Sequence, residues 1–61
     1  MLAQDIKRGY YLKQNEHYIK IKRVQRVGEK VDITLEREPD NLVVTTFRVP
    51  ASQDVDVVER V

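Results

Sequence analysis

The sequence predicts an all-β protein, and three observations support this fold class. Ten valines and four isoleucines stand against only two alanines and one methionine. β-Branched side chains are stiff at χ1 and suit a pleated, half-buried surface, whereas alanine is the strongest helix former. Apolar and polar residues alternate in short runs, and glycine, proline or asparagine separates these runs. Apart from one short turn, no helix is expected.

The length of the chain allows a single domain, residues 1–61, with one core. A chain this short buries only about 60% of its unfolded surface, so its stability is modest. The absence of cysteine excludes disulfides and thiolate metal sites. No run approaches the roughly 18 apolar residues of a membrane span, and the first residues lack the apolar core of a signal peptide. A cytoplasmic protein without a membrane partner is expected.

The chain begins with a predicted turn and a short strand. Residues 2–9 form the turn, in which Gly9 is free to adopt a positive φ. Residues 10–13 form the first strand. It ends at a loop in which Asn15 suits a left-handed turn position.

Residues 17–27 predict a long second strand with an irregularity. Its apolar residues alternate with polar ones up to Ile21, and the period of two then slips before Val24. One extra residue, a β-bulge near Lys22 and Arg23, restores the inward face and bends the strand.

Two further strands follow, each after a turn. Residues 28–30 have the length of a hairpin connection, and residues 31–35 alternate apolar and polar side chains without interruption. Pro39 presets φ for a turn at residues 39–41. The fourth strand is residues 42–49. It is expected to direct three side chains inward: Thr45, Phe47 and Val49.

A proline separates the fourth strand from the last one. Pro50 has no N–H for a central ladder, and residues 50–53 fit one turn of 3₁₀ helix. Residues 55–61 then form the fifth strand. The inward positions of all strands predict the core: Ile6, Leu12, Ile19, Ile21, Val24, Val31, Ile33, Leu35, Phe47, Val49, Val55 and Val57.

This order of elements resembles a five-stranded SH3-like barrel with a 3₁₀ turn before the last strand. It is similar to the amino-terminal KOW-like domain of translation elongation factor P, which opens with an acidic-hydrophobic-basic-basic-glycine run and carries Thr-Phe-Arg in a late strand. Residues 5–9 (DIKRG) and 46–48 (TFR) match those features. The resemblance covers nearly the whole chain and implies the barrel fold. The factor's Pro-Gly-Lys-Gly-Gly loop is replaced by residues 27–30 (VGEK), so a translation function is not implied.

The side chains offer little for catalysis. His17 is the only histidine and Ser52 the only serine, so no nucleophile–base pair can be assembled. The acidic residues near the end of the chain are typical of a solvated strand, since divalent sites need several oxygens converging from a loop. The chain is also too short for a pocket of several hundred Å³. A non-enzymatic protein without cofactor, metal or small-molecule substrate is expected.

The net charge of +1 conceals an asymmetry. Residues 1–30 carry eight Lys and Arg against three Asp and Glu, a net charge of +5. Residues 31–61 carry three Arg against seven Asp and Glu, a net charge of −4. A surface of one sign steers charged partners, although strands from both halves interleave in a barrel.

Two binding functions fit these observations. The first is a protein-interaction barrel or accessory protein, because residues 42–44 and 57–58 hold more apolar side chains than can all face inward. A protein partner or a second copy would contact the outward residues Tyr11, Leu42, Val44 and Val58.

The alternative is single-stranded nucleic-acid binding by the basic, aromatic stretch 18–30. Lysine and arginine contact phosphates, and a tyrosine ring stacks on an unpaired base for about 1–3 kcal/mol. The candidate residues are Tyr18, Lys20, Lys22, Arg23, Arg26 and Lys30, joined by Tyr10 or Tyr11.

A neutralised solvent face competes with this alternative, because outward strand positions are polar in any barrel. Three acids of the following strand are placed to pair with the basic residues across the ladder: Asp32, Glu36 and Glu38.

Overall fold

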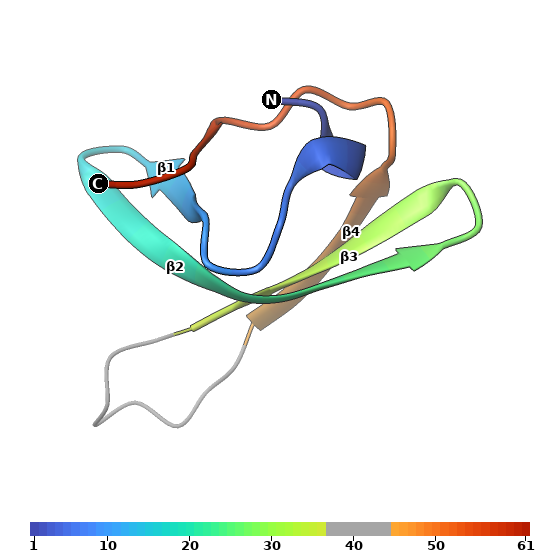
Figure 1. The fold of residues 1–61 in the computed structure, drawn as a ribbon, viewed down its shortest axis with the longest axis horizontal. Helices are drawn as coiled ribbons and strands as arrows, with labels where there is room; N and C mark the ends of the chain where they lie inside the picture. Colours follow the sequence, from blue (N-terminus) through green and yellow to red (C-terminus); the bar gives the residue numbers. More distant parts are fainter. Residues whose placement is uncertain (37–44) are drawn as a thin grey trace.

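The computed structural model describes residues 1–36 and 45–61, which form an antiparallel sheet with one 3₁₀ turn (Figure 1). In chain order the described elements are η1 (Ala3–Asp5), β1 (Tyr11–Gln14), β2 (His17–Val27), β3 (Lys30–Leu35), β4 (Thr45–Pro50) and β5 (Val57–Val58). The strand order across the sheet is β4-β3-β2-β1-β5. The all-β fold with five antiparallel strands is therefore confirmed over this part of the chain.

β2 belongs to two ladders and joins them. Its first half pairs with β1 and its second half with β3, and the register shifts between Ile21 and Arg23. Lys22 is the extra residue, so the predicted β-bulge is confirmed. The bulge keeps both Ile21 and Val24 on the core side, and the strand curves strongly through this region (Figure 1).

The core lies on the concave side of this curved strand. The buried residues are Ala3, Ile6, Ile21, Val31, Ile33, Leu35, Ala51 and Val57. The other predicted core residues pack against them while partly exposed: Leu12, Ile19, Val24, Phe47, Val49 and Val55. Every predicted core residue therefore belongs to this assembly. Ala3 and Ala51 were not predicted; both are buried, and the Gln4 N–H beside Ala3 donates to the Ala51 carbonyl at 3.0 Å.

The first residues of the chain lie beside the segment that leads into β5 (Figure 1). The Ala3 N–H donates to the Gln53 carbonyl at 2.8 Å, and Leu2 forms an isolated bridge with Asp54. The Met1 amine donates to the Asp54 carboxylate at 2.7 Å, and the Val55 N–H donates to the Met1 carbonyl at 2.7 Å. These hydrogen bonds occupy backbone N–H and C=O groups of residues 53–55, which a longer last strand would need for pairing.

Three predictions about this region are therefore corrected. The last strand is Val57–Val58 rather than residues 55–61. The 3₁₀ turn lies at Ala3–Asp5 rather than at residues 50–53. At residues 50–53, one hydrogen bond from the Gln53 N–H to the Pro50 carbonyl closes a single turn. It goes no further because the chain on either side bonds to other segments. β4 and β5 do not pair within the described residues, so the sheet is open and the predicted closure of a barrel is not observed.

Local conformations agree with the turn residues. Asn15 has φ 58° and Gly9 has φ 95°, both in the left-handed region that was predicted for them. The predicted turn at residues 39–41 lies outside the described residues, as do Glu38, Leu42 and Val44. No helix in the described ranges is long and apolar enough to cross a membrane.

Candidate functional site

Two tyrosines and two lysines share the outer face of the β1–β2 hairpin. Leu12 lies opposite Ile19, and both pack against the core. Because side chains alternate between the faces of a strand, the neighbours of these two residues point away from the core. These neighbours are Tyr11, opposite Lys20, and Lys13, opposite Tyr18, and we refer to the four as the Tyr–Lys quartet.

The quartet has a diagonal arrangement. Tyr11 and Tyr18 occupy one diagonal of the two cross-strand pairs, and Lys13 and Lys20 occupy the other. The Tyr18 residue is 45% exposed, whereas Tyr11 is half-buried beside Val58 of β5. The quartet therefore combines two accessible rings with two exposed ammonium groups.

Basic side chains continue along β2 beyond the quartet. Lys22 is exposed at the bulge, and Arg23 lies opposite Thr34 with its side chain exposed. Lys30 is also exposed, at the far end of the β2–β3 hairpin opposite Val27. We call the quartet together with Lys22 and Arg23 the outer basic surface.

The structure separates Arg26 from this surface. Arg26 lies opposite Val31, which is buried, so the two side chains share the core-facing side of the sheet. The Arg26 Nε donates to the Gly28 carbonyl at 2.6 Å, which holds the exposed side chain against its own turn.

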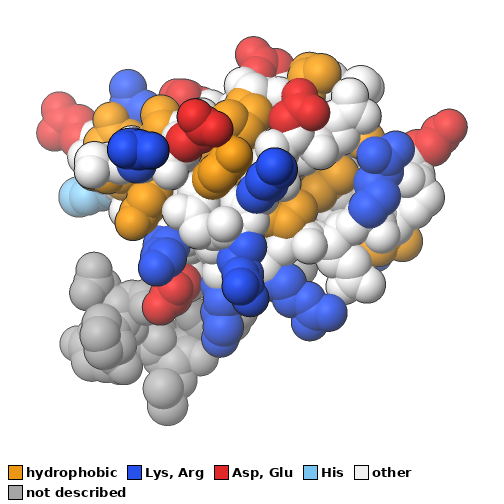
Figure 2. Space-filling model, viewed as in Figure 1, with side chains coloured by type: hydrophobic (Ala, Val, Ile, Leu, Met, Phe, Trp, Pro, Cys, Tyr) orange, Lys and Arg blue, Asp and Glu red, His pale blue; other side chains and the backbone are white. Residues whose placement is uncertain are grey.

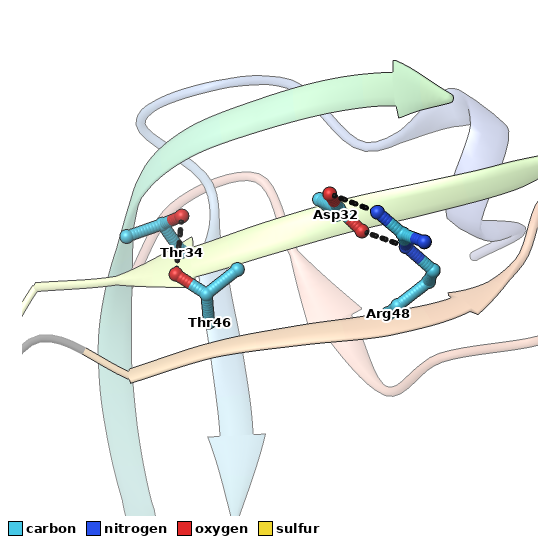
Figure 3. A network of polar contacts seen from close by, with 4 residues as sticks. All are labelled: Asp32, Thr34, Thr46 and Arg48. Atoms are coloured by element: carbon cyan, nitrogen blue, oxygen red, sulfur yellow. Dashed lines mark hydrogen bonds and ion pairs between the residues drawn. The ribbon is translucent and has the colours of Figure 1, made fainter.

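Asp32 forms its ion pair away from β2. It lies opposite Gln25 on one side and Arg48 of β4 on the other. Arg48 donates from Nε to Asp32 Oδ1 at 2.6 Å and from Nη2 to Oδ2 at 3.0 Å, beside a Thr34–Thr46 hydroxyl pair at 2.9 Å (Figure 3). These hydrogen bonds lower the pKa of the Asp32 carboxyl and raise the pKa of Arg48.

Two acidic residues, Glu36 and Asp56, are bonded through their backbones to residues of the outer basic surface. The Glu36 N–H donates to the Lys20 carbonyl at 2.8 Å, and the Lys13 N–H donates to the Asp56 carbonyl at 2.9 Å. Within residues 1–36 and 45–61, however, no ion pair joins either acid to a cation of this surface. In the view of Figure 2, several Lys and Arg side chains gather below the centre with an acidic side chain beside them, and other Lys and Arg side chains stand among the acidic ones in the upper half.

Lys13 is the functional candidate that sequence reasoning missed. The first strand was predicted to end at Lys13, whereas it extends to Gln14, which pairs with His17 across the two-residue turn Asn15–Glu16. That turn length sets the register and places Lys13 opposite Tyr18. A two-residue turn with asparagine first was the signal for this register.

Tyr10 does not join the outer surface. It packs against the core, and its hydroxyl donates to the Glu59 carboxylate at 3.0 Å. This hydrogen bond, followed by partial burial and the negative charge of Glu59, raises the pKa of the Tyr10 phenol. Of the two tyrosines considered, Tyr11 is the one on the candidate surface.

No family model, curated protein or solved structure matches this chain. The chemistry of the outer basic surface is therefore what indicates a function.

Proposed function

We propose that this chain is a small binding domain for single-stranded nucleic acid, of the SH3-like barrel type, and that the outer basic surface is its interface. The cross-strand pairs Tyr11–Lys20 and Lys13–Tyr18 are the observation that carries the proposal. They present aromatic rings and cations together on one face, which is the combination that proteins use to bind single strands. The barrel type is supported by the sharply bent β2 and by the pairing of Leu2 with Asp54, which brings the start of the chain to the segment before β5.

The electrostatics of the face favour phosphate as the charged part of the ligand. Four cations lie on it, namely Lys13, Lys20, Lys22 and Arg23, and two acidic residues are bonded to its backbone. Asp32, the acid in the middle of β3, is already held by Arg48. A polyanion binds such a face by displacing counterions, so its affinity falls as salt rises.

The test is a fluorescence-anisotropy titration of a short polythymidine strand at several salt concentrations. Contact of four phosphates predicts a slope of log K against log salt of about −3. Exchange of Lys20 and Lys22 for glutamate is expected to abolish measurable binding. No binding by the wild type in about 50 mM salt would overturn the proposal, as would an unchanged affinity in the double variant.

A matched pair of single variants tests the position of the interface. Arg23→Glu and Arg26→Glu make the same change of charge on the same strand, but their side chains lie on opposite faces of the sheet. Arg23→Glu is expected to weaken binding strongly and to reduce the salt slope, whereas Arg26→Glu is expected to bind nearly as the wild type does. Equal losses in both variants would show attraction to net charge rather than binding at the outer face. Circular dichroism confirms that both are folded.

A protein-interaction role is the second candidate. Val58 lies beside Tyr11 on the outer face, and tyrosines are enriched at the centres of protein interfaces. Concentration-dependent sedimentation that Val58→Asp abolishes would favour this role, provided that the same titration shows no nucleic-acid binding.

A further inference from the structure

We infer that the Tyr–Lys quartet is a two-base site, in which Tyr11 and Tyr18 each stack on one of two successive unpaired bases and Lys13 and Lys20 contact the flanking phosphates. This inference rests on the proposed function and adds to it the part of the ligand that each residue binds. It also specifies a strand with unstacked bases as the ligand.

The diagonal position of the rings carries the inference. Residues on a diagonal of neighbouring antiparallel strands are about 7–8 Å apart. Successive bases in a duplex are only about 3.4 Å apart along the axis. Two bases that keep duplex stacking therefore cannot each cover one ring. A single strand can stack one base on each ring when its backbone extends and its bases separate.

The lysines complete the site because they alternate with the rings. Lys20 lies directly opposite Tyr11, and Lys13 lies directly opposite Tyr18, so each base platform has a cation beside it. A nucleotide has the same composition, one flat base and one phosphate. Two nucleotides thus match the four side chains by number, chemistry and alternation.

The exposure of the two rings predicts an order of importance. Tyr18 is 45% exposed, which leaves its ring open to a base. Tyr11 is half-buried and borders Val58, so part of its surface already contacts protein. Loss of the Tyr18 ring is therefore expected to cost more affinity than loss of the Tyr11 ring.

Paired substitutions of each tyrosine test the stacking role. Tyr18→Leu removes the π face and keeps an apolar side chain, whereas Tyr18→Phe keeps the π face and removes only the hydroxyl. The leucine variant is expected to bind polythymidine about 5- to 140-fold more weakly, and the phenylalanine variant nearly as the wild type does. The same pair at Tyr11 is expected to show a smaller loss. Equal affinity of the leucine and phenylalanine variants would overturn the two-base site.

The oligonucleotide provides a second, independent comparison. An abasic strand of the same length keeps the phosphates but lacks the bases, so it is expected to bind more weakly than polythymidine with a similar salt slope. Binding should also quench tyrosine emission, which is readable because the chain has three tyrosines and no tryptophan. In a Tyr10→Phe variant the remaining tyrosines are Tyr11 and Tyr18, so the emission comes from the quartet alone.

The outcomes separate the two proposals. Equal, salt-sensitive binding of the abasic and polythymidine strands, with no effect of Tyr18→Leu, would leave a phosphate-binding surface and overturn the two-base site. Absence of salt-sensitive binding to either strand would overturn the proposed function itself, and the two-base site with it.

Discussion

Asp32 decides how much of the charge on β2 remains available. It lies in the middle of β3, between a strand with many cations and a strand with one. Its two oxygens accept hydrogen bonds from Arg48, so the guanidinium that neutralises it comes from β4. The sequence suggested neutralisation of β2 because Asp32 lies on the neighbouring strand, where it was placed to pair across the ladder. In the structure, the residue of β2 that lies opposite Asp32 is Gln25 rather than a lysine, so Asp32 has no basic residue of β2 directly across the ladder.

The Asp32–Arg48 pair predicts a pH dependence of stability. Hydrogen bonds from Arg48 hold the pKa of Asp32 in the folded protein below its ordinary value of 3.8. The stability from this group is therefore fully present above about pH 4 and is lost as the pH falls through the folded pKa. At neutral pH, Asp32→Asn is expected to lower Tm by a few degrees at most, since the pair is exposed to solvent.

Thermal melts of the wild type and Asp32→Asn between neutral pH and about pH 2 check this. The difference in Tm between the two proteins should shrink below about pH 4. A constant difference across the whole range would mean that the stability does not come from ionised Asp32. Because the Asp54 carboxyl, whose pKa the Met1 amine lowers, is present in both proteins, its own titration cancels.

At the scale of the strand, the bulge at Lys22 lets β2 serve two ladders. The sequence predicted it well, because a slip in the apolar period between Ile21 and Val24 has one simple structural explanation. The register of the β1–β2 hairpin was predicted less well, because it depends on the length of one turn. The first strand was predicted to end one residue too early, so Lys13 was not recognised as the cross-strand neighbour of Tyr18 that completes the quartet.

Deletion of Lys22 tests the role of the bulge. Removal of this residue leaves Ile21, Arg23 and Val24 in strict alternation, so the inward face is kept and only the bend is lost. The deletion is expected to lower the free energy of unfolding by more than about 1 kcal/mol, because the two ladders no longer meet over one core. Lys22→Ala, which keeps the bulge, is expected to change it by less than about 0.5 kcal/mol.

Urea denaturation of the two variants measures both values. Similar stabilities of the deletion and Lys22→Ala would show that the bend is not required for the core.

At the scale of the whole molecule, the core was largely predictable and the closure of the sheet was not. Alternation in residues 31–35 and 45–49 identified the inward side chains, because each pattern depends only on neighbours along the strand. The pairing of Leu2 with Asp54 joins residues far apart in the chain, and no local pattern indicates it. The same contact explains why the last strand is short.

Ile33 is the position where the core is most sensitive. It is fully buried in the middle of β3, between Val24 and Phe47 on the flanking strands. Ile33→Ala is expected to cost about 2–5 kcal/mol and Ile33→Val about 0.5–1.5 kcal/mol. The total stability expected for this length is about 3–9 kcal/mol, so the alanine variant is close to unfolding.

Chemical denaturation of the isoleucine, valine and alanine series gives these differences. Phe47→Ala is a useful comparison, since Phe47 is only partly buried and should cost less than a fully buried phenylalanine. An Ile33→Ala variant as stable as the wild type would contradict the inward assignment of β3.

The two edges of the open sheet have unequal consequences for aggregation. A strand from another molecule adds to an edge through a row of unpaired backbone N–H and C=O groups. β5 presents only two residues of such an edge, which is too short to template an added strand. β4 is longer and ends at Pro50, which has no N–H to donate. Among the described strands, growth of the sheet from copy to copy is therefore expected at residues 46–49 of β4, and a charge or a second proline placed there is the simplest way to keep concentrated samples soluble.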